Sequence, residues 1–142
     1  MKNRSNLFCL ILTAMLVFCA TNANAKPKQT TIYVFGISIS LTDSTAYLTD
    51  IQTLETAYID NKTGFLYDRS IYSQQLQMWI EYSKNKPGTT CAIFFGEKKS
   101  KVEKKYIKVR NKYNKDRSTK LHSLETGEFK FIPQDWSEHE SL

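Results

Sequence analysis

Few side chains in this sequence of 142 residues are suited to covalent or acid–base chemistry. Beyond the N-terminal segment the chain keeps one cysteine, Cys91, and two histidines, His122 and His139. A nucleophilic cysteine needs a neighbouring base and a lowered pKa. His139 lies in an acidic C-terminal stretch, which leaves His122 as the candidate base. Apolar residues 92–95 follow Cys91, a context typical of a buried thiol that packs as a small hydrophobe. The sequence therefore favours a structural role for Cys91.

Carboxylates in the first half of the chain could catalyse glycan hydrolysis as an acid–base pair. The candidates are Asp43, Asp50, Glu55, Asp60 and Asp68. Their spacing selects no pair, and a small periplasmic hydrolase that uses them with His122 is the alternative function. One cysteine and two distant histidines lack the spacing of a zinc site, so the sequence predicts neither a metal site nor a cofactor.

The strongest chemical signal is the positive charge between residues 97 and 120. This segment holds eleven Lys or Arg and three acids, whereas the whole chain has a formal net charge of +6. Several of these lysines recur at helical spacing on the side opposite Val102, Tyr106 and Val109. The predicted binding residues are Lys101, Lys104, Lys105, Lys108 and Lys112. Such a face attracts anionic partners, although charge on an amphipathic helix ordinarily serves only as a solvated surface.

The predicted partner is an anionic component of the cell envelope or an acidic protein. Lipopolysaccharide, teichoic acid and peptidoglycan carboxylates all remain open, as does the oligomeric state. Binding to nucleic acid is disfavoured, because stacking on bases requires aromatic side chains among the basic ones. Tyr106 and Tyr113 instead fall on the apolar side of the helix.

Hydrophobic patterning predicts the elements that position these residues. Alternation of apolar residues indicates strands, and a repeat of three and four indicates helices. Segment 52–59 fits both patterns, and an extended conformation is favoured there. The predicted elements are strands at 31–41, 45–51 and 52–59, a helix at 70–84, a strand at 89–95, a helix at 98–113 and a strand within 120–132.

This order, β-β-(β)-α-β-α-β, predicts an α+β fold. The expected form is a two-layer sandwich with both helices packed on one face of a mixed sheet. A right-handed crossover would make the strands at 90–95 and near 128–132 parallel. A single globular domain is predicted at 31–133, with a flexible lead-in at 26–30 and an acidic, disordered tail at 134–142.

The N-terminal segment has the pattern of a cleavable signal peptide. Lys2 and Arg4 precede an apolar run at 7–20, and Ala23 and Ala25 form a small-x-small cleavage site. As a helix the run spans about 21 Å, which is shorter than a bilayer core of about 30 Å. Residues 1–25 are therefore predicted to be removed, leaving a periplasmic or secreted protein.

A resemblance to known proteins rests on six short stretches of the chain. They are Tyr33-Val34-Phe35-Gly36, Asp50-Ile51-Gln52, Thr63-Gly64-Phe65-Leu66, Tyr72-Ser73-Gln74-Gln75-Leu76, Thr90-Cys91 and Glu103-Lys104-Lys105-Tyr106. Together they resemble short, signal-peptide-bearing proteins of unknown function from Gram-negative gut bacteria. The resemblance implies a periplasmic or secreted setting and assigns no reaction, ligand or site.

Together these observations predict an exported, non-catalytic binding or interaction module of the cell envelope. The basic helix is its predicted contact surface. Besides the hydrolase, a structural subunit that pairs through an exposed edge of its sheet is the remaining alternative.

Overall fold

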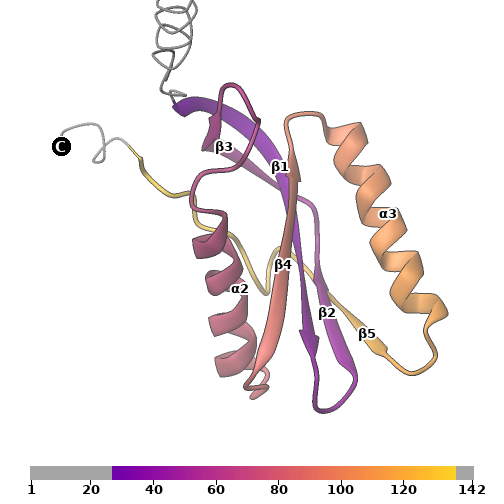
Figure 1. Ribbon diagram of the computed structural model, residues 1–142. Helices are drawn as coiled ribbons and strands as arrows, with labels where there is room; N and C mark the ends of the chain where they lie inside the picture. Colours follow the sequence, from indigo (N-terminus) through magenta and orange to yellow (C-terminus); the bar gives the residue numbers. More distant parts are fainter. Residues whose placement is uncertain (1–26, 137–142) are drawn as a thin grey trace, which may run out of the picture.

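The computed structural model describes residues 27–136 as an α+β domain with a mixed sheet (Figure 1). Its elements are β1 (Pro27–Ser40), β2 (Thr45–Thr49), β3 (Gln52–Asp60), α2 (Arg69–Ser83), β4 (Thr89–Gly96), α3 (Lys99–Lys115) and β5 (Lys120–Leu124). The predicted α+β class and the order of strands and helices are confirmed, and segment 52–59 is a strand. Within this part of the chain, no helix has the length and apolar character to cross a membrane.

β1 is the central strand of the sheet. One edge of β1 pairs antiparallel with β3 and then β2, and its other edge pairs antiparallel with β4. β5 lies parallel to β2 on the far side of that strand. β4 and β5 therefore run in the same direction, with β1 and β2 between them. The prediction of a parallel strand near 128–132 is wrong, because β5 is residues 120–124 and residues 128–132 lie outside the sheet.

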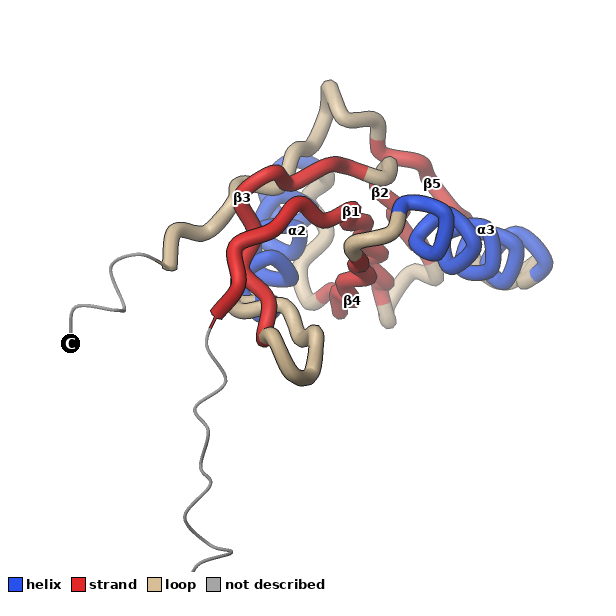
Figure 2. The backbone as a smooth tube through the Cα atoms, turned by 90° about the horizontal axis from the view of Figure 1, so that it is seen from above, coloured by secondary structure: helices blue, strands red, loops and turns tan. Residues whose placement is uncertain are grey.

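The two helices lie on opposite faces of the sheet (Figure 2), so the prediction that both pack on one face is wrong. Successive side chains of a strand point to opposite faces. Val34 belongs to the core beneath α2, whereas Phe35 belongs to the core beneath α3. The Phe35 ring meets that of Tyr106 in α3, with 5.2 Å between centroids. The middle of β1 carries buried apolar side chains on both faces, Ile32 and Val34 on one and Phe35 and Ile37 on the other, and each face needs its own cover to exclude water.

The core beneath α2 also receives the chain that follows β5. The last strand ends at Leu124, and Phe129 and Phe131 reach this core from an extended segment outside the sheet. The Gln52 side chain holds the segment: its Nε2 donates to Phe129 O at 2.9 Å, and its Oε1 accepts from Phe131 N at 2.9 Å. A buried amide side chain thus replaces the main-chain pairing that a strand would have made.

The described parts of the predicted lead-in and tail are packed against the domain. Residues 27–30 form the start of β1 and pair with β3, so they are not a flexible lead-in. In the predicted tail, Gln134 N donates to Tyr72 Oη at 3.1 Å, and the Trp136 ring lies 4.5 Å from that of Tyr67. Residues 1–26, with the predicted signal peptide, and residues 137–142 lie outside the described part of the chain.

Candidate functional site

The rotation of α3 on the sheet is set by its apolar side chains. Val102 is 1% exposed, and Tyr106, Val109 and Tyr113 pack partly buried against the same core. These residues recur every three or four positions, so one side of α3 faces the sheet and the opposite side faces solvent. The two tyrosines lie on the core side, as predicted from the sequence.

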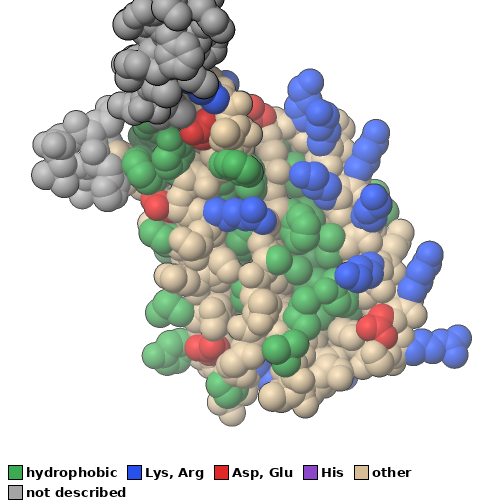
Figure 3. Space-filling view, in the orientation of Figure 1, with side chains coloured by type: hydrophobic (Ala, Val, Ile, Leu, Met, Phe, Trp, Pro, Cys, Tyr) green, Lys and Arg blue, Asp and Glu red, His purple; other side chains and the backbone are tan. Residues whose placement is uncertain are grey.

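All five predicted binding lysines project from the solvent side of α3. At about 100° per residue they fall within an arc of roughly 100°, and each is exposed. We call these residues the lysine face: Lys101, Lys104, Lys105, Lys108 and Lys112. Lys and Arg side chains stand out along this side of the molecule in Figure 3.

In the described part of the chain, no acidic side chain forms an ion pair with a residue of the lysine face. Among residues 27–136, the ion pair that involves α3 joins Lys99 to Glu103 at 4.0 Å, and neither residue belongs to the lysine face. Lys112 Nζ lies 5.6 Å from the centroid of the Tyr113 ring, a cation–π contact that leaves its charge in place. The face therefore presents a concentrated positive charge to solvent.

Beside the lysine face lies a depression of about 240 Å³ between α3 and the end of β4. It is lined by Phe95, Gly96, Glu97, Lys98, Lys101, Val102 and Lys105. A second depression of about 350 Å³ adjoins it and shares Phe95, Gly96 and Lys105. This second depression is also lined by Phe65 and Arg69, which lie thirty or more positions before α3 in the sequence. Local sequence patterns carry no signal that these residues meet.

Two charged residues beside the depressions, Arg69 and Glu97, make polar contacts with neighbouring strands. Arg69 donates through Nη2 to Ile93 O at 2.8 Å, and its guanidinium lies 5.7 Å from the centroid of the Phe95 ring. Glu97 accepts hydrogen bonds from Lys28 Nζ at 3.2 Å and from Thr30 Oγ1 at 3.1 Å. The Lys28 ammonium, followed by the Thr30 hydroxyl, lowers the pKa of Glu97. The charge of Glu97 is thus compensated from β1 and not by the lysine face.

The structure does not bring Cys91 and His122 together. They lie on β4 and β5, which are separated by β1 and β2, so three strand spacings of about 4.8 Å place them roughly 14 Å apart. Burial raises the pKa of the Cys91 thiol, the opposite of what a nucleophile needs. The His122 ring instead stacks on Tyr47, with 5.1 Å between centroids.

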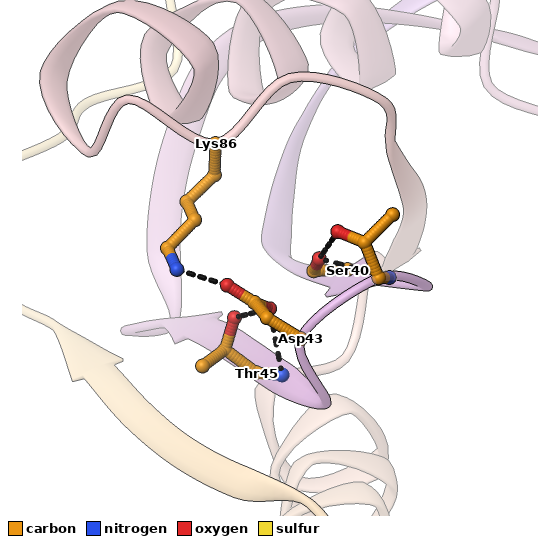
Figure 4. Close-up of polar contacts among 5 residues, drawn as sticks. Ser40, Asp43, Thr45 and Lys86 are labelled. Carbon is orange, nitrogen blue, oxygen red and sulfur yellow. Dashed lines mark hydrogen bonds and ion pairs between the residues drawn. The ribbon is translucent and has the colours of Figure 1, made fainter.

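Four of the five candidate carboxylates make structural contacts. Asp43, in the turn between β1 and β2, accepts hydrogen bonds from Lys86 Nζ and from Thr45 Oγ1 (Figure 4). Asp50 accepts a hydrogen bond from Thr126 N at 3.1 Å, and Asp60 accepts from Lys62 N and Thr63 N at 2.8 Å each. Asp68 accepts a hydrogen bond from Trp136 Nε1. Residues 27–136 contain no group of three or more His, Cys, Asp or Glu side chains that could hold a metal ion.

Asp68 occupies the N-cap position of α2. Its carboxylate makes no cap hydrogen bond, and it accepts from Trp136 instead. The main-chain oxygen of Asp68 accepts from Ile71 N at 2.8 Å at the start of the helix. The side chain of Asp68 thus contacts the segment that follows β5 and does not cap α2.

Comparison of the chain with protein-family models, with curated proteins and with solved structures finds no significant match.

Proposed function

We propose that this protein is an exported, non-catalytic binding module of the cell envelope, and that its lysine face contacts an anionic partner. The observation that supports the proposal most directly is the exposure of five lysines on one side of α3. A focused positive field of this kind raises the local concentration of anions and speeds their association. The N-terminal pattern of a signal peptide supports the exported setting.

The spacing of the lysines favours a binding role over simple solvation. Lys101 and Lys105, Lys104 and Lys108, and Lys108 and Lys112 are like-charge pairs four positions apart. Each such pair destabilises an isolated helix by about 0.2–0.5 kcal/mol. Glutamates interspersed among the lysines would keep the helix soluble and remove this repulsion. An anionic partner removes the same repulsion on binding.

The contacts of β4 argue against the alternative function, in which two chains pair through an exposed edge of the sheet. This strand pairs with β1 along one edge. Two of its carbonyls already accept hydrogen bonds from α2: Ser73 Oγ donates to Cys91 O at 3.1 Å, and Arg69 donates to Ile93 O. Side chains of α2 thus partly cover the strand that a second chain would have to join.

Affinity chromatography on heparin, a generic polyanion, tests the lysine face. We expect the variant Lys104→Glu/Lys108→Glu to elute at clearly lower salt than the wild type, because screening by salt competes with attraction between charges. The matched control is Lys120→Glu/Lys130→Glu, which changes the net charge equally at exposed positions outside α3. Circular dichroism verifies that both variants fold. Equal elution of the two variants would refute the proposal.

A further inference from the structure

We infer that the anionic partner is a lipid, whose phosphate headgroup is bound by the cations around the end of β4 while its acyl chain lies against the aromatic side chains beside them. The inference rests on the proposed function and specifies the chemical class of the partner. It follows from the two adjoining depressions, which we call the β4 groove: Phe65, Arg69, Phe94, Phe95, Gly96 and Lys105 are the residues that the argument uses.

Aromatic side chains line the β4 groove from both faces of the sheet. Phe94 packs against the core beneath α3 and Phe95 against the core beneath α2, because they are successive residues of β4. The Phe94 ring stacks on Phe35 with 4.9 Å between centroids. Phe65, in the turn after β3, stands at the groove with 67% of its surface exposed. Hydrophobic side chains gather between β4 and α3 in Figure 3, next to the projecting cations. The exposed ring of Phe65, beside the half-buried rings of Phe94 and Phe95, favours contact with hydrocarbon over contact with water.

The rim of the β4 groove is cationic. Arg69 comes from the start of α2, Lys98 from the loop after β4, and Lys101 and Lys105 from α3. Glu97 is the acid that lines the groove, and Lys28 compensates its charge. The contact of Arg69 with Ile93 O engages Nη2 and orients the planar guanidinium, whose remaining N–H groups suit phosphate oxygens. Three separate elements thus direct positive charge at the β4 groove.

This combination favours a lipid over a purely polar anion. A free phosphate would bind the cations by charge alone and would gain nothing from the exposed ring of Phe65. A protein that lies on an anionic membrane shows both features, with aromatic residues for the acyl region and Lys or Arg for the headgroups. The cationic side chains therefore suit the phosphate headgroup of a lipid, and the aromatic side chains suit its acyl chain.

Co-sedimentation of the purified protein with vesicles tests the inference. We expect the wild type to bind vesicles of phosphatidylglycerol mixed with phosphatidylcholine and not vesicles of phosphatidylcholine alone. The variant Phe65→Ser/Arg69→Gln should weaken binding to the anionic vesicles about tenfold or more, since it removes one buried aromatic ring and one cation from the contact. The matched control, Tyr82→Ser/Lys130→Gln, also loses an exposed aromatic ring and a cation, and it should bind as the wild type does.

Titration with soluble ligands separates a lipid from a free phosphate. A short-chain phosphatidylglycerol should shift the amide resonances of Phe65 and Gly96, whereas glycerol phosphate at the same concentration should not. If Arg69→Gln impairs folding in thermal melts, Phe65→Ser alone against Tyr82→Ser serves the same purpose, because both positions are exposed.

The failure of this inference is distinct from the failure of the proposed function. Anionic-vesicle binding that survives Phe65→Ser/Arg69→Gln unchanged, or equal shifts with glycerol phosphate, would overturn the lipid assignment even if the Lys104→Glu/Lys108→Glu variant lost heparin binding. Undiminished heparin binding by that lysine-face variant would instead overturn the proposed function. Loss of vesicle binding in the groove variant, with heparin elution matching that of its control, supports the lipid assignment.

Discussion

At the scale of single residues, Asp43 shows how a candidate catalytic group becomes a structural one. Its carboxylate joins the turn after β1 to Lys86, in the loop between α2 and β4, and also accepts from the Thr45 hydroxyl (Figure 4). The Lys86 ammonium, followed by the Thr45 hydroxyl, holds the pKa of Asp43 well below its ordinary value of 3.8. The charged form is therefore favoured by folding.

This coupling predicts how stability depends on pH. A carboxyl group whose pKa is lower in the folded state stabilises the fold above its unfolded pKa, and this contribution is lost as the pH falls through the folded pKa. We expect Asp43→Asn to lower the melting temperature at pH 7. The difference from the wild type should shrink steadily as the pH falls below about 4.

Thermal melts between pH 7 and pH 2 measure this difference. Glu55→Gln, at an exposed position of β3, is the control for the loss of a surface carboxylate. A gap between Asp43→Asn and the wild type that stays constant over this range would show that the charge of Asp43 does not stabilise the fold.

At the scale of elements, two glutamines hold the extended segment that follows β5. Gln52 binds Phe129 O and Phe131 N from a position that is 5% exposed. Gln75 of α2 makes the same two-sided contact with Ile132 at the surface, donating to its oxygen at 3.0 Å and accepting from its nitrogen at 2.9 Å. Each glutamine thus donates to one main-chain oxygen and accepts from one main-chain nitrogen of the segment. The two sites differ in their access to water.

This difference predicts unequal effects of two similar substitutions. Gln52→Ala leaves one buried N–H and one buried C=O without a partner and should lower the free energy of unfolding by about 2–4 kcal/mol. Gln75→Ala should lower it by less than about 1 kcal/mol, because water replaces the amide. Urea denaturation measures both values, and hydrogen exchange at the Phe131 amide should accelerate only in Gln52→Ala. Equal losses of stability would contradict this account of the segment.

The helix α3 depends on the sheet for its stability more than on its own sequence. Its lysines repel one another, and short isolated helices are marginal in water. Val102 and its partly buried neighbours supply the packing that holds it. This dependence explains how a helix can present so concentrated a charge and still be regular over 17 residues.

At the scale of the whole molecule, the opposite placement of the helices separates two surfaces. The face beneath α2 is completed by Phe129 and Phe131, whereas the face beneath α3 borders the lysine face and the β4 groove. The lysine face therefore lies on the α3 side of the molecule, and the β4 groove, which Arg69 of α2 also lines, reaches from that side around the edge strand β4. The segment that precedes β1 bears on a separate point, the cellular location of the protein.

Export predicts a defined N-terminus for the mature protein. When the full chain is expressed in a Gram-negative host, the intact mass should correspond to a protein that begins at Lys26, because small residues at 23 and 25 fit a signal peptidase. Ala25→Leu should block this cleavage, whereas Lys26→Gln should not. Recovery of the uncleaved chain, or of a product lipidated at Cys19, would contradict the predicted cleavage site.

The sequence alone determined the features that depend on neighbours along the chain. Periodicity placed the strands and helices, and the spacing from Lys101 to Lys112 placed the lysine face opposite Val102, because the geometry of one helix suffices for both. The tertiary structure decided which helix covers which face of β1, since alternation groups residues without saying what packs on each group. It also decided the β4 groove, where Phe65, Arg69 and Lys105 meet through long-range packing. No local pattern encodes such a meeting, because its energy comes from contacts between segments distant in the sequence.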